Sequence, residues 1–133
     1  MPPMSDYTIT SIQDVPDQAA AFGFGEVGEA RFGRETVGAS DTGFAFHRFN
    51  PGKRSSFGHR HEAAEEVAFV LEGTGRLKVD DDVVEVARHD VIRLAPQVMR
   101  AWEAGDEGLT VLVFGPYTPK DGALDHDFWP VEG

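Results

Sequence analysis

Between about residue 43 and residue 115 the chain is a series of short apolar runs, each ended by a few turn residues. Runs spaced by about 8 to 12 residues are typical of the strands of a β-sandwich or β-barrel. No long segment has the 3.6-residue periodicity of an amphipathic helix. The sequence therefore predicts an all-β domain, with strands expected at 44–49, 67–71, 75–79, 83–87, 91–94, 100–103 and 109–114.

The length of 133 residues is enough for one domain with a hydrophobic core. Residues 1–42 read as an N-terminal extension rich in Gly, Pro and small residues, with a possible edge strand at 8–12 and a helical turn at 16–21. Residues 43–115 carry the predicted barrel. Residues 116–133 are expected to form a C-terminal tail without regular secondary structure. Its Phe128 and Trp129 are expected to dock on the barrel or on a partner subunit.

Charge and composition exclude several classes of protein. The formal net charge of -11 repels nucleic-acid phosphate and anionic membranes, so neither is an expected partner. The absence of cysteine excludes disulfides and thiolate metal sites. The N-terminus lacks the features of a secretory signal, and no apolar run approaches the roughly 20 residues that span a bilayer. We therefore expect a cytoplasmic protein.

The clearest chemical signal is a group of three potential metal ligands. His59 and His61 are two residues apart, so on a strand both imidazoles point to the same face. Glu66 begins the next apolar run, and if the two strands lie side by side it joins the histidines in one cavity. Two imidazoles and a carboxylate form the ligand set of many non-haem iron sites.

Two stretches of the sequence resemble the conserved motifs of the cupin family. The resemblance covers about residues 43–115 and implies a single-domain jelly-roll barrel (a double-stranded β-helix), often dimeric, that holds a metal or a small ligand inside. In the first motif, Glu66 has the expected spacing from Gly73, whereas Glu65 does not. The residues that carry the resemblance are Pro51-Gly52, His59-Arg60-His61, Glu66 and Gly73, then 89–96 and Arg100-Ala101-Trp102.

One departure from the family pattern affects the site directly. Arg100 occupies the position that normally supplies the third metal-binding histidine, and a guanidinium cannot ligate a cation. Two arrangements follow. In one, His59, His61 and Glu66 hold a divalent metal while Arg100 orients an anionic ligand. In the other, Arg100 pairs with Glu66, no metal binds, and the histidines line a polar pocket.

Two further residues are candidates for contact with a ligand. Trp102 alternates with Arg100, so both side chains are expected to face the interior, where Trp102 forms a pocket wall or simply part of the core. His47 alternates with Ala45 and Phe49 and is expected to point inward beside the site, either as a packed residue or as a third nitrogen ligand.

The leading hypothesis is a cupin that binds a small, anionic molecule in the barrel, with or without a weakly held divalent metal (iron, manganese, nickel or zinc). The alternative is a metal-dependent enzyme of the oxygenase or isomerase type. A sensory module ranks last, because no DNA-binding helix pair is visible. The motifs of serine hydrolases and cysteine proteases are absent. No organic cofactor is expected. We expect the protein to form a homodimer.

Overall fold

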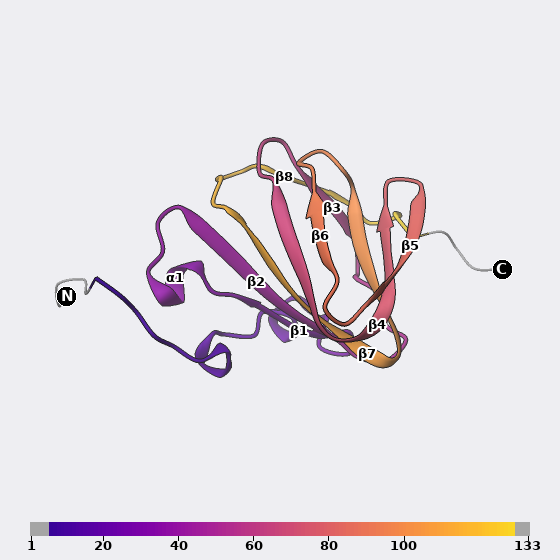
Figure 1. Cartoon of the computed structure of the whole chain (residues 1–133), viewed down its shortest axis with the longest axis horizontal. Helices are drawn as coiled ribbons and strands as arrows, with labels where there is room; N and C mark the ends of the chain where they lie inside the picture. The colour runs from indigo at the N-terminus through magenta and orange to yellow at the C-terminus, as the bar shows by residue number, and fades with distance from the viewer. Residues whose placement is uncertain (1–5, 130–133) are drawn as a thin grey trace.

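The structure is a computed structural model in which residues 6–129 are described. Within this range the chain forms a curled antiparallel sheet, preceded by two 3-10 turns and interrupted by one turn of α-helix between the first two strands (Figure 1). The predicted all-β class is confirmed. The elements are η1 Ile12–Asp14, η2 Ala20–Phe22, β1 Gly28–Phe32, α1 Arg34–Val37, β2 Thr42–Phe49, β3 Gly58–His61, β4 Glu66–Val79, β5 Asp82–Ala87, β6 Val91–Leu94, β7 Arg100–Pro116 and β8 Gly122–Asp125.

Two long strands, β4 and β7, organise the sheet. One path of pairing runs β1-β2-β7-β3-β8, and β4 pairs with β5, β6 and β7. The strands curl around a common interior, as expected for a jelly-roll barrel (Figure 1). Strand β3, which carries the His-x-His motif, pairs with β7 and β8, and among the described residues it does not pair with β4. The condition under which Glu66 was predicted to join the histidines, two strands lying side by side, is therefore not the arrangement that the structure has.

The sequence predicted breaks where β4 and β7 in fact continue. Strands expected at 67–71 and 75–79 are one strand, and so are those expected at 100–103 and 109–114. The register between β4 and β7 shifts on both sides of Gly73, which has φ +81°. A Cβ at this position would lie 2.0 Å from the carbonyl oxygen of Gly108. These glycines therefore form bulges that bend the pair without ending it.

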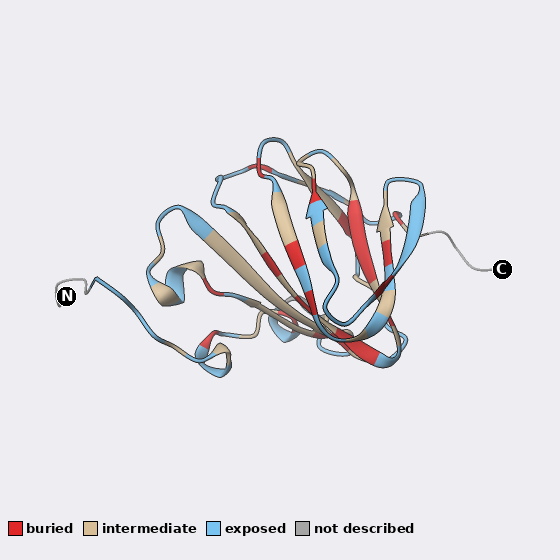
Figure 2. Ribbon diagram, viewed as in Figure 1, coloured by how far each residue is buried: buried red, intermediate tan, exposed pale blue. Residues whose placement is uncertain are grey.

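The core lies on the inner face of β4 and β7. Along β4, buried Ala68 and Val70 alternate with exposed Phe69 and Leu71, as the period of two requires (Figure 2). The same alternation on β7 buries the odd-numbered residues near its C-terminal end. The principal core cluster consists of Phe49, Ala68, Val70, Leu77, Val86, Leu94, Trp102, Ala104, Leu109, Val111 and Val113.

The N-terminal extension contributes an edge strand, although not where it was expected. Residues 8–12 form no strand, and the only regular structure near them is η1. The edge strand is β1, which pairs with β2 from Gly28↔Phe49 to Phe32↔Ala45. The helical turn expected at 16–21 appears as η2, shifted toward the C-terminus.

The C-terminal tail packs on the barrel and is not coil throughout. Its strand β8 pairs with β3 over four residues, from Gly58↔Asp125 to His61↔Gly122. Beyond it, the ring of Phe128 packs so closely on Gly58 that a Cβ there would come within 2.6 Å of the ring. Phe128 is buried, so the tail covers the strand that carries both histidines.

In the part of the chain that the structure describes, no helix has the length and apolarity required to cross a membrane. Three apolar side chains are exposed on the neighbouring strands β4 and β6, namely Phe69, Leu71 and Val91. The homodimer, the cytoplasmic location and the division at residues 42 and 115 stay predictions.

Candidate metal centre

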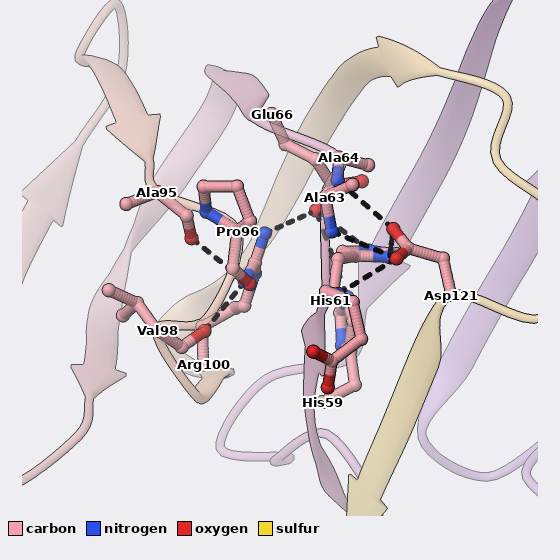
Figure 3. Close-up of polar contacts among 11 residues, drawn as sticks. His59, His61, Ala63, Ala64, Glu66, Ala95, Pro96, Val98, Arg100 and Asp121 are labelled. Atoms are coloured by element: carbon pink, nitrogen blue, oxygen red, sulfur yellow. Dashed lines mark hydrogen bonds and ion pairs between the residues drawn. The ribbon is translucent and has the colours of Figure 1, made fainter.

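His59, His61 and Glu66 converge inside the barrel as the sequence predicted. Each offers one ligand atom, and these atoms all lie within 4.8 Å of one another. The two histidines share one face of β3 because they alternate with Arg60 along the strand. Their rings are 5.4 Å apart and nearly perpendicular. The three side chains therefore surround one point from two different strands, β3 and β4 (Figure 3).

One carboxylate oxygen of Glu66 faces all of its polar neighbours. Oε1 lies 3.8 Å from Nε2 of His59, 3.5 Å from Nε2 of His61 and 2.9 Å from Nη2 of Arg100. Burial by itself would raise the pKa of Glu66. The contacts with the two histidines and the positive charge of Arg100 outweigh burial, so the pKa lies well below the ordinary value. Glu66 is therefore an anion at neutral pH.

Arg100 lies fully inside the protein and is held from two sides. Its residue exposure is 0%, and Nη2 donates to Oε1 of Glu66. Nη1 donates to three carbonyl oxygens of the turn before β7, those of Ala95 at 3.4 Å, Pro96 at 3.0 Å and Val98 at 2.6 Å (Figure 3). The guanidinium thus neutralises Glu66 and fixes a turn, which is the pairing expected in the second of the two predicted arrangements.

The imidazole of His61 lies between two carboxylates. Its Nε2 faces Glu66, and its Nδ1 lies 3.4 Å from Oδ2 of Asp121. Nε2 is buried and has no hydrogen-bond partner among the described residues. A buried imidazole nitrogen without a partner, aimed at a second imidazole and a carboxylate, fits the donor set of a divalent metal.

Asp121 belongs to the site but was not predicted. Oδ1 accepts hydrogen bonds from the backbone N–H groups of Glu62 and Ala63, and Oδ2 accepts one from Ala64. Burial would raise the pKa of Asp121, but these three N–H groups lower it below the ordinary value. A single aspartate in a tail rich in Pro and Gly has no periodicity or motif that could have identified it.

His47 lies beside the three candidate ligands as an uncharged imidazole. Its ring stacks on Phe49 at 5.8 Å and meets the edge of Phe32 at 5.7 Å. Burial and repulsion from His59 lower the pKa of His47 to about 4, and the charge of Glu66 opposes them only in part. The structure does not include His47 in the three-ligand group, and a direct contact with a ligand stays a prediction.

Trp102 forms part of the hydrophobic core, the second of the two roles predicted for it. It is 4% exposed and belongs to the principal core cluster, on the strand that also carries Arg100. A contact between Trp102 and a ligand stays a prediction.

Comparisons with known proteins agree with this geometry. Residues 45–115, more than half of the chain, match the cupin domain. An eight-stranded antiparallel barrel with two histidines and a glutamate inside defines a small single-domain cupin, and this chain belongs to the cupin family.

The relatives differ in how much of their length they share with the chain. The uncharacterized protein MJ1618 of Methanocaldococcus jannaschii is 32% identical over 66 residues, which are 47% of this chain and 53% of that protein. The chain thus matches about half the length of this curated relative.

Two solved structures show the same fold. A cupin protein from Bacteroides fragilis is 18% identical with a TM-score of 0.70, covering 88% of this chain and 89% of that one. Oxalate decarboxylase from Bacillus subtilis is 18% identical with a TM-score of 0.72, over 92% of this chain and 33% of the enzyme.

Proposed function

We propose that this cupin binds a small anionic molecule inside the barrel, at a divalent metal centre held by His59, His61 and Glu66. The observation that carries the proposal is the convergence of the three ligand atoms within 4.8 Å of one another. The buried Nε2 of His61, which has no hydrogen-bond partner in the described chain, supports it independently.

The donor set limits the choice of metal. Two imidazoles and one carboxylate suit iron, manganese, nickel or zinc better than calcium or magnesium, which prefer oxygen ligands. Three protein ligands on one side of an ion leave positions open for a small molecule.

Arg100 makes the metal weakly held without excluding it. Its hydrogen bond to Glu66 orients the carboxylate, as partners of metal ligands commonly do. Its charge repels a cation, however, and at an effective dielectric of about 20 two like charges some 5 Å apart cost on the order of 3 kcal/mol. The expected affinity is therefore below that of a cupin with a third histidine.

The balance of charge favours an anion as the bound molecule. Glu66 and Arg100 neutralise each other, and a divalent ion adds positive charge that Asp121 offsets only in part. A carboxylate or a similar oxygen anion, bound at the coordination positions that the protein leaves open, neutralises the remaining positive charge. The guanidinium of Arg100 has both terminal nitrogens engaged, so the attraction comes from the centre as a whole and not from Arg100 alone.

A metal-dependent enzyme of the oxygenase or isomerase type is the second candidate. A bound metal would supply Lewis-acid polarisation of a coordinated substrate. The observation that favours catalysis is His47, whose pKa of about 4 leaves a neutral imidazole beside the ligands at physiological pH. Such a neutral group can donate or accept a hydrogen bond and so orient a bound molecule, while its pKa near 4 makes it a weak base.

Metal analysis tests the proposal. The protein is reconstituted with Fe²⁺, Mn²⁺, Ni²⁺ or Zn²⁺ at micromolar concentration, and bound metal is measured after buffer exchange. We expect about one ion per chain, lost in His61→Ala and retained in His126→Ala, because His126 is exposed and lies outside the three-ligand group. Absence of metal from the unmodified protein, or equal retention in both variants, overturns the proposal.

A further inference from the structure

We propose that Asp121 is the positioning residue of the metal centre, delivered to His61 by the C-terminal segment, so that docking of this segment and metal binding stabilise each other. The inference rests on the proposed metal function and extends it to a part of the chain outside the matched cupin domain. We refer to residues 121–129 as the C-terminal strap.

Asp121 is built into the site and not merely near it. Its side chain is 4% exposed, and Oδ2 lies 3.4 Å from Nδ1 of His61. Its carboxylate accepts hydrogen bonds from the backbone N–H groups of three consecutive residues, Glu62, Ala63 and Ala64. These are the first three of the four loop residues, 62–65, that join His61 to the strand of Glu66. One carboxylate therefore holds both a metal-ligand side chain and the connection between the two ligand strands (Figure 3).

The contact determines which nitrogen of His61 is available. A neutral imidazole carries one N–H, and the other nitrogen offers a lone pair. Glu66 lies 3.5 Å from Nε2 and favours a proton there, but its charge is already neutralised by the guanidinium of Arg100. Asp121, which lies 3.4 Å from Nδ1 and also only accepts hydrogen bonds, has no such cation among the described residues and therefore favours the form with the proton on Nδ1. Nε2, which faces Glu66 and His59, then has its lone pair directed into the centre. A carboxylate behind a ligating histidine supports metal binding by this means in many proteins.

The strap is anchored independently of Asp121. Gly122 through Asp125 pair with β3 along its full length, and Phe128 packs on Gly58. Nζ of Lys78 lies 3.6 Å from the centre of the Phe128 ring. These contacts place Asp121 opposite His61 before any metal arrives. The strap thus lies beside β3 as the next strand of the sheet, and its first residue reaches the imidazole of His61.

Coupling between the strap and the centre follows from thermodynamic reciprocity. If the docked strap raises metal affinity by orienting His61, bound metal must stabilise the docked strap by the same factor. Loss of a partner behind a ligating histidine commonly lowers metal affinity by about tenfold to a hundredfold. We expect an effect of this size from Asp121→Asn, which replaces one acceptor oxygen with a donor.

The experiment compares Asp121→Asn with Asp127→Asn, a control that removes the same charge from an exposed position of the strap. Mn²⁺ or Zn²⁺ affinity is measured by titration. Hydrogen exchange of residues 122–125 is measured with and without the metal. We expect Asp121→Asn alone to weaken binding by at least tenfold, and metal to slow exchange in the unmodified protein but not in this variant. Equal affinity in the two variants overturns the inference.

A second measurement does not depend on the folding of the variant. The ring nitrogens of His61 in the metal-free, unmodified protein are observed by ¹⁵N NMR. A proton on Nδ1 supports the inference, and a proton on Nε2 overturns it. The proposed function and this inference fail separately: no metal uptake by the unmodified protein overturns the function, whereas full uptake with unchanged affinity in Asp121→Asn overturns only the role of Asp121.

Discussion

Nη2 of Arg100 donates a hydrogen bond of 2.9 Å to Oε1 of Glu66, the same oxygen that both histidines face. One carboxylate thus serves a buried cation and the candidate metal centre together. The pair is nearly dry, because the side chain of Arg100 is 1% exposed and that of Glu66 is 17% exposed. Removing either partner leaves the other as a buried charge without a counter-charge.

Glu66→Gln is expected to destabilise the metal-free protein. The substitution keeps the shape of the side chain but leaves the buried guanidinium of Arg100 without its counter-charge. Breaking a buried pair in this way costs about 3 kcal/mol or more in the free energy of unfolding. Urea unfolding monitored by circular dichroism measures the loss.

The matched control is Glu65→Gln. Glu65 lies 3.6 Å from Arg93, and both side chains are more than half exposed. Exposed pairs contribute at most about 1 kcal/mol. Similar losses in the two variants would show that the Arg100–Glu66 pair is no stronger than a surface contact.

Arg100→His is expected to strengthen metal binding while weakening the fold. The new imidazole supplies the third nitrogen ligand and removes a repelling charge, so affinity should rise by tenfold or more. The hydrogen bonds from Nη1 to the carbonyl groups of Ala95, Pro96 and Val98 are lost, so the metal-free protein should unfold at a lower urea concentration. Zinc titration and urea unfolding measure the two effects. An unchanged affinity would mean that position 100 does not face the centre.

Stability is expected to fall as the pH drops through the range below 6.5. The pKa of His47 is lowered from 6.5 to about 4, so between these values the unfolded chain binds a proton that the folded protein does not. The contribution of His47 is therefore complete above pH 6.5 and is lost on the way to pH 4. Glu66, whose pKa is also lowered, adds a loss below its ordinary value of 4.5.

His47→Phe separates these two contributions. Phenylalanine keeps an aromatic ring between Phe32 and Phe49 but cannot take up a proton. In chelator-treated protein, the loss of unfolding free energy between pH 6.5 and pH 4.5 should shrink by on the order of 2 kcal/mol. His126→Ala, at an exposed position, should leave the slope unchanged. If His47→Phe also leaves it unchanged, His47 is not held in its neutral form by the fold.

Gly73→Ala is expected to disrupt the bulge between β4 and β7. Gly73 has φ +81°, and its Cβ would meet the carbonyl oxygen of Gly108 at 2.0 Å. Gly52 has a similar φ of +73° with no atom within 4 Å, so Gly52→Ala measures the conformational cost alone, about 1 kcal/mol. The clash at Gly73 should add about 1 to 3 kcal/mol. Equal costs in thermal unfolding would contradict a steric role for the bulge.

The sequence by itself determined the parts of the site that depend on local geometry. His59 and His61 share a face because side chains alternate along a strand, and the same rule turned Arg100 inward. The short apolar runs identified most strand positions, and the cupin motifs selected Glu66 over Glu65. These inferences hold because they need only the conformation of a few consecutive residues.

Only the tertiary structure decided which distant groups meet. Within the described chain, the strands of His59 and Glu66 do not pair with each other, and each is instead placed by its pairing with β7. Gly73 and Gly105 to Gly108 looked like chain breaks, since a glycine in a bulge and a glycine in a turn have the same local signature. Asp121 reaches His61 across 60 residues of sequence only because β8 pairs with β3. No local pattern encodes such a contact, because its energy depends on where the rest of the chain has folded.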